Sequence, residues 1–165
     1  VRDEIHAAAS RCDPSAEIEP LGLVPSHPLL RPADILSSAA LPGRLTAMDV
    51  GVASPHSAGA GADCTQAMVQ AKKATYAPYY HELRTNGITY LPLVWSSYGR
   101  PHPDAVRVLL TLARNTARRR GSQEYRGLAR QTAARIASAL WRRAANMVLA
   151  CWPKLATPQD VVGTS

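Results

Sequence analysis

The chain has 165 residues, the length of one ordinary domain, and its 46% hydrophobic content is sufficient for a buried core. It contains no run of eighteen apolar residues, and its first residues are acidic where a signal peptide would be basic. We therefore expect a soluble intracellular domain. Cys12, Cys64 and Cys151 are far apart and form no CxxC pair, which argues against a disulfide framework and a zinc module and predicts buried thiols.

Charge is unevenly distributed along the chain. Residues 1–98 carry seven Lys and Arg against nine Asp and Glu, a net charge of −2, whereas residues 99–157 carry twelve against two, a net charge of +10. A basic helical part beside an acidic part is typical of a protein that contacts a phosphate backbone with one and holds cations with the other. The alternative is a solvated face of Arg-rich helices, and charge alone leaves both interpretations open.

Hydrophobic periodicity and turn signals predict the element order αβββαβαα, a single α/β domain with a small mixed sheet and flanking helices. Pro92 lacks an amide hydrogen, which predicts an edge position for its strand. The predicted elements are a helix over 2–11, a weak strand over 18–24, strands over 34–36 and 45–53 joined by a turn at Pro42-Gly43, a helix that has Asp63 as its N-cap and runs to about Thr85, a strand over 89–96, and helices over 104–120 and 123–152.

Three charged residues fall where these elements would bring them together. Asp34 and Asp49 lie on two neighbouring predicted strands, and Lys72 lies on the inward stripe of the following helix, whereas Lys73 does not. Two carboxylates are suitable ligands for Mg²⁺, which supports phosphodiester cleavage, and an ammonium group can orient water or stabilise charge on the phosphate. Alternatively, the aspartates form turns or caps and the lysine extends from the edge of an apolar stripe. Tyr76, one turn after Lys72, either contacts DNA backbone or packs.

Four segments of the chain together resemble a known family. They are Arg-Pro-Ala-Asp-Ile-Leu at 31–36, Leu-Thr-Ala-Met-Asp-Val-Gly-Val-Ala-Ser-Pro at 45–55, Lys72 with Tyr76, and Tyr-Leu-Pro-Leu-Val-Trp-Ser at 90–96. In this order they resemble the restriction-enzyme-like endonuclease domain of site-specific non-LTR retrotransposons, within the PD-(D/E)XK nuclease superfamily. The resemblance spans about residues 2 to 103. It differs from the family pattern where Ala33 separates Pro32 from Asp34 and where Gly51 replaces the usual lysine two residues after the second acid.

The resemblance implies a restriction-endonuclease-like core with the order αβββαβ over residues 1–103. Periodicity and charge add a basic helical extension packed on this core over 104–152, followed by a tail over 153–165. The resemblance also implies that Asp34 and Asp49 bind Mg²⁺ or Mn²⁺, with Glu19 as a further metal-binding acid. Lys72 would be the catalytic lysine, moved from the strand to the helix. The domain would nick double-stranded DNA in the nucleus, with an upstream reverse transcriptase domain on the same polypeptide as partner and RNA as a second possible nucleic acid.

Two further functions remain open from the sequence. One is a catalytically inactive copy that only binds nucleic acid, and the other is a helical module whose arginines contact an acidic protein. Competition by duplex DNA discriminates between them better than salt dependence, because a charged protein interface is screened as well. The arginines expected to contact nucleic acid are Arg107, Arg114, Arg118, Arg119 and Arg120, with Arg126 and Arg130 on the last helix.

Overall fold

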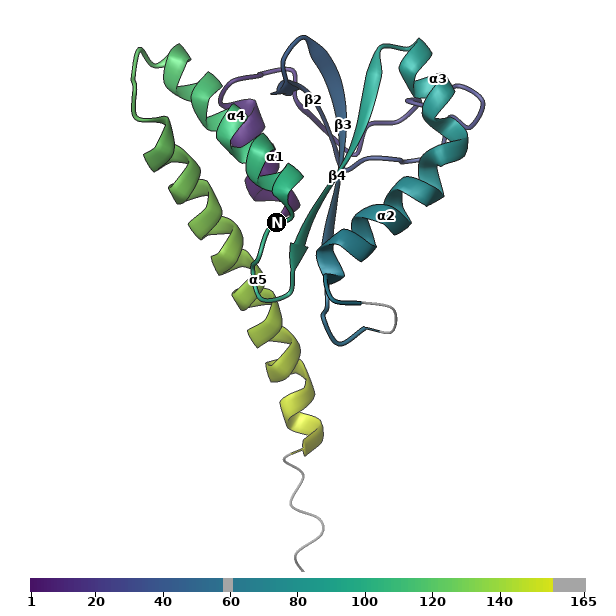
Figure 1. Ribbon diagram of the computed structural model, residues 1–165. Helices are drawn as coiled ribbons and strands as arrows, with labels where there is room; N and C mark the ends of the chain where they lie inside the picture. Colours follow the sequence, from purple (N-terminus) through teal and green to yellow (C-terminus); the bar gives the residue numbers. More distant parts are fainter. Residues whose placement is uncertain (58–60, 156–165) are drawn as a thin grey trace, which may run out of the picture.

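The computed structural model describes residues 1–57 and 61–155 of the chain. Its centre is a four-stranded mixed sheet with the order β1-β2-β3-β4, in which β1, β2 and β3 pair antiparallel and β4 runs parallel to β3 (Figure 1). This confirms the predicted mixed α/β fold with a small mixed sheet. The strands are β1 (Glu17–Ile18), β2 (Ile35–Leu41), β3 (Arg44–Ala53) and β4 (Ile88–Ser96).

Helices cover both faces of the sheet (Figure 1). One face packs against α1 (Arg2–Ser10), α4 (Pro103–Arg119) and the first part of α5 (Tyr125–Leu155), which extends beyond the sheet. The other face packs against α2 (Cys64–Tyr76), the 3₁₀ turn η1 (Ala77–Tyr79) and α3 (Tyr80–Thr85). Within the described residues, no helix combines the length and hydrophobicity that crossing a membrane requires.

Alternation along β3 and β4 assigns each side chain to one layer. Met48 on β3 and Leu93 and Trp95 on β4 belong to the core shared with α1, α4 and α5. Their neighbours Ala47 and Val94 belong to the cores beneath α2 and α3. Asp49 is therefore on the α2 side of the sheet by alternation.

Local sequence signals explain where several elements begin and end. Gly43 has a φ of +66° in the turn between β2 and β3, and Gly87 has a φ of +71° after Asn86, the C-cap of α3. Glycine adopts this left-handed conformation at little cost. The Asp63 side chain accepts hydrogen bonds from the backbone of Thr65 and Gln66, capping α2 as predicted. β4 lies at the edge of the sheet, as Pro92 predicts.

Some sequence predictions of secondary structure are wrong. The strand expected over 18–24 is limited to Glu17–Ile18, since Pro20 and Gly22 interrupt it. The helix expected from Asp63 to Thr85 is interrupted by η1, because Pro78 has no amide hydrogen for the helical ladder. Helix α5 continues to Leu155, into the segment expected to be a tail, and residues 156–165 lie outside the described part of the chain.

A buried carboxylate connects the end of α1 to β2. Asp13 accepts hydrogen bonds from the hydroxyl of Ser15 at 2.6 Å, the hydroxyl of Ser37 at 2.7 Å and the amide of Ser38 at 2.7 Å. Burial by itself raises the pKa of this carboxyl, but the hydrogen bonds from the three serines outweigh burial and hold its pKa well below the ordinary value. The ionised form of Asp13 therefore stabilises the folded chain.

Replacing Asp13 with Asn should lower the free energy of unfolding at pH 7 by about 2 kcal/mol. Because the pKa of Asp13 is lowered in the folded state, its contribution is complete above the unfolded pKa of about 4 and is lost as pH falls through the folded pKa. The difference between wild type and Asp13→Asn, measured by urea unfolding, should therefore shrink between pH 7 and pH 3. A difference that stays constant with pH would contradict this account.

Candidate functional site

A buried carboxylate on β3 holds together three elements on the α2 side of the sheet. Asp49 is 8% exposed, one oxygen accepts a hydrogen bond from Lys72 Nζ of α2 at 2.6 Å, and the other accepts one from the Tyr90 hydroxyl of β4 at 2.6 Å. A carboxylate in this position is stable only when charge and hydrogen bonds compensate for lost hydration. Lys72, and not Lys73, supplies that charge, as the helical stripe predicts.

Gly51 makes room for Lys72 to reach Asp49. A Cβ atom at Gly51 would lie 2.7 Å from Lys72 Cε and 2.8 Å from Met68 Sδ, both much closer than ordinary contact. The lysine side chain therefore passes over the strand where a side chain at position 51 would begin. Gly51, where the sequence differs from the family pattern, is thus also the residue that leaves space for Lys72 of the helix.

Two tyrosines surround this ion pair. The ring centroids of Tyr76 and Tyr90 are 5.1 Å apart, so Tyr76 packs against β4. Burial, together with the hydrogen bond to Asp49 and its charge, raises the pKa of Tyr90 far above its ordinary value. Burial and the charges of Asp49 and Asp34 also raise the pKa of Tyr76. Both phenols are therefore neutral hydrogen-bond donors at physiological pH.

Asp34 is directly before β2, at the point where β3 extends beyond its partner. Ile35 pairs with Met48, which places Asp34 and Asp49 next to each other along the β2–β3 ladder. The Asp34 carboxylate accepts the Val50 amide at 2.8 Å and satisfies a strand amide that β2 does not reach. It also lines a hollow of about 620 Å³ beneath α1 and α5, on the side of the sheet opposite to the contact between Asp49 and Lys72. That the two carboxylates share one cation stays a prediction.

The acids expected to bind a metal differ in how many of their carboxylate oxygens already have protein partners. One oxygen of Asp34 has no hydrogen-bond partner among the described residues, and carboxylates retain further lone pairs after accepting one hydrogen bond. Glu19 instead forms ion pairs with Arg2 and with Arg31, the latter at 2.9 Å. In the described part of the chain, no group of three or more His, Cys, Asp or Glu side chains is placed to hold a metal ion.

The arginines predicted to contact nucleic acid are exposed on α4, in the loop after it and on α5. Some have protein partners: Arg107 pairs with Asp104 at 3.0 Å, and the Arg114 guanidinium lies 4.9 Å from the centre of the Tyr125 ring. Val106 of α4 is also exposed (40%), because the buried stripe of this helix runs through Val108 and Leu112. Arg118, Arg119, Arg120, Arg126 and Arg130 are also exposed.

Comparison with known proteins identifies no relative. No protein family, curated protein or solved structure matched this chain. Its function is therefore inferred from its own residues and from the sequence resemblance.

Sequence reasoning missed two members of this site. Tyr90 was part of the resemblance, but only strand alternation, which places positions 88, 90, 92 and 94 on one face, could have directed it toward Asp49. Gly51 was identified as the replacement of a lysine, and its role as space for Lys72 depends on how α2 crosses β3. No sequence pattern specifies that crossing.

Replacing Lys72 with Met should lower the free energy of unfolding by about 2 kcal/mol, because it leaves the buried Asp49 carboxylate without its counter-ion. Lys73→Met on the next position should change it by less than about 0.5 kcal/mol, since Lys73 forms no ion pair in the described residues. Urea unfolding at pH 7 measures both. Equal effects for the two variants would show that the Asp49–Lys72 pair does not stabilise the fold.

Proposed function

We propose that the chain is a metal-dependent endonuclease domain of the PD-(D/E)XK type, which nicks double-stranded DNA by phosphodiester hydrolysis. We further propose that it belongs to a retrotransposon-type polyprotein with an upstream reverse transcriptase. The resemblance of residues 2–103 suggests this family, and the geometry around Asp49 supports the chemistry.

The observation that carries the proposal is the contact between Lys72 and Asp49 across Gly51. The family pattern places a lysine two residues after the second acid, on the same face of the strand. Here the ammonium group comes from α2 instead, and its stem occupies the space that a side chain at position 51 would take. The chain therefore keeps an acid and a lysine together although the strand lysine is absent.

Within this proposal, Asp34 and Asp49 would hold Mg²⁺ or Mn²⁺, which lowers the pKa of bound water and stabilises negative charge on the phosphate. Lys72 would contribute positive charge close to the reacting phosphate. The Tyr90 hydroxyl, held neutral, orients Asp49 by donating to one of its oxygens. Tyr76 would contact the DNA backbone at the rim of the site.

A second candidate function is nucleic-acid binding without cleavage. Two observations favour it: both oxygens of Asp49 accept hydrogen bonds from protein side chains, and Glu19 is paired with two arginines. Of the three acids, only Asp34 therefore keeps a carboxylate oxygen without a hydrogen-bond partner among the described residues. In this case the exposed arginines of α4 and α5 would bind phosphates, and Asp49 and Lys72 would only stabilise the fold.

A lysine exchange between strand and helix tests the proposed catalysis. Lys72→Ala should reduce Mg²⁺-dependent nicking of supercoiled plasmid by about 100-fold, since it removes a charge that stabilises the transition state. The double variant Gly51→Lys/Lys72→Ala restores a lysine two residues after Asp49, on the same strand face, and should recover part of the activity. Single-turnover nicking rates measure both.

Controls separate catalysis from folding. Arg135→Ala removes a positive charge from an exposed position on α5 and should retain wild-type nicking, while Asp49→Asn should abolish nicking and retain DNA affinity. Circular dichroism establishes that each variant is folded. Nicking that persists in a folded Asp49→Asn preparation would refute the hydrolytic mechanism, and absent nicking with intact DNA binding would favour the second candidate.

Changing Arg118, Arg119 and Arg120 together to Gln should weaken binding to unrelated duplex sequences by similar factors. Each lost phosphate contact should flatten the slope of log affinity against log salt by about 0.9. Arg107→Gln is the control, because its guanidinium is already paired with Asp104. Fluorescence anisotropy between about 50 and 200 mM salt measures the slope. An unchanged slope would exclude phosphate contacts by these three arginines.

A further inference from the structure

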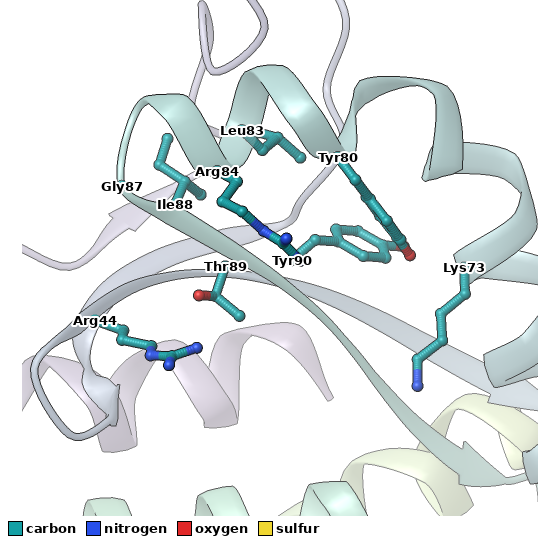
Figure 2. A pocket seen from close by; sticks show the side chains of 9 residues that line it. All are labelled: Arg44, Lys73, Tyr80, Leu83, Arg84, Gly87, Ile88, Thr89 and Tyr90. Atoms are coloured by element: carbon teal, nitrogen blue, oxygen red, sulfur yellow. The ribbon is translucent and has the colours of Figure 1, made fainter.

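A cavity of about 670 Å³ lies along the edge strand β4, with Tyr80, Arg84 and Tyr90 on the α3 side of the strand and Arg44 and Thr89 on its other side (Figure 2). Three cationic side chains reach it from three different elements: Arg44 at the start of β3, Lys73 on α2 and Arg84 on α3. Its lining contains no Asp or Glu. Thr89 of β4 contributes a hydroxyl group between the arginines (Figure 2).

The three cations have no counter-ion within the described residues. The ion pairs there involve other basic groups, and Arg44, Lys73 and Arg84 take part in none of them. Like charges around one hollow repel each other, and this repulsion is relieved when an anion enters. Guanidinium groups bind phosphate oxygens in pairs, and an ammonium group binds them as a point charge. Phosphate is therefore the ligand chemistry that the lining fits.

One residue connects this cavity to the candidate site. The Tyr90 ring lines the cavity, and the Tyr90 hydroxyl donates to Asp49. The two adjacent lysines of α2 also connect the two places, since Lys72 binds Asp49 and Lys73 faces the cavity. Tyr80 packs beside Tyr90 with ring centroids 5.7 Å apart, adding an aromatic surface of the kind on which nucleotides stack.

We infer that this cavity binds the phosphodiester backbone of a nucleic-acid strand next to the Asp49–Lys72 site. The inference rests on the proposed function for the identity of the strand. A volume of about 670 Å³ lies within the range of pockets that hold small organic ligands, so a nucleotide unit with its phosphate fits. Arg44, Lys73 and Arg84 bind the phosphate oxygens, and Tyr80 and Tyr90 contact the sugar or base.

The test is a metal-free NMR titration of ¹⁵N-labelled protein with 5′-phosphorylated tetrathymidylate and, separately, with inorganic phosphate. We expect the oligonucleotide to shift the amide signals of Gly87, Thr89 and Tyr90, at a lower concentration than phosphate does. Lys73→Gln/Arg84→Gln should weaken oligonucleotide binding at these amides by about tenfold or more, because two charge-assisted contacts are lost. Arg44→Gln, at an exposed position, should also weaken oligonucleotide binding.

Arg135→Gln/Arg142→Gln is the charge-matched control, since both arginines are exposed on α5, which contributes no residue to the lining of the cavity. This control should leave the oligonucleotide affinity measured at the Thr89 amide within about twofold of the wild-type value. Shifts confined to α4 and α5, or equal losses in the two double variants, would overturn the inference. So would equal affinities for phosphate and oligonucleotide, which would define a small-anion site. Cavity binding in a protein that fails to nick DNA would refute the proposed hydrolysis and leave the strand-binding cavity standing.

Discussion

The ion pair between Asp49 and Lys72 is the interaction on which the α2 side of the molecule depends. Removing a carboxylate from water costs several kcal/mol, and that cost is offset only while Lys72 and Tyr90 both donate to it. The pair therefore fixes how α2 crosses β3 and how β4 aligns beside β3, since each element supplies one partner. Gly51 is part of the same constraint, because any side chain there would displace the lysine stem.

The contact between Lys72 and Asp49 also gives the two lysines of α2 different surroundings. Successive helical residues point about 100° apart, so fixing Lys72 on Asp49 turns Lys73 toward the hollow beside β4. The half-buried Lys72 is paired with Asp49, whereas Lys73 has no ion-pair partner among the described residues and is available to an external anion. A site that combines a compensated acid with uncompensated cations nearby suits a ligand that carries several negative charges along its length.

Local sequence signals predicted most helices, strands and turns, whereas contacts between residues far apart in the sequence were not predictable from them. The turn at Gly43, the Asp63 cap and the edge position of Pro92 each depend on the conformational limits of one or two residues, which sequence displays directly. Pro78, which divides the predicted helix, is a local signal of the same kind. The pairing of Glu19 with Arg2 and Arg31 was not visible, because it joins α1 and the segment before β2 through tertiary contact.

Asp34 shows how one residue is suited to both structure and chemistry. Its amide donates to Met48 and one carboxylate oxygen accepts from Val50, so it closes the β2–β3 ladder at the position where β2 begins. Closing the ladder holds the carboxylate in place with one oxygen engaged and the other without a protein partner in the described residues. A carboxylate held by the backbone in this way loses little side-chain entropy when it binds a cation. The structural role of Asp34 is thus compatible with its proposed role as a metal ligand.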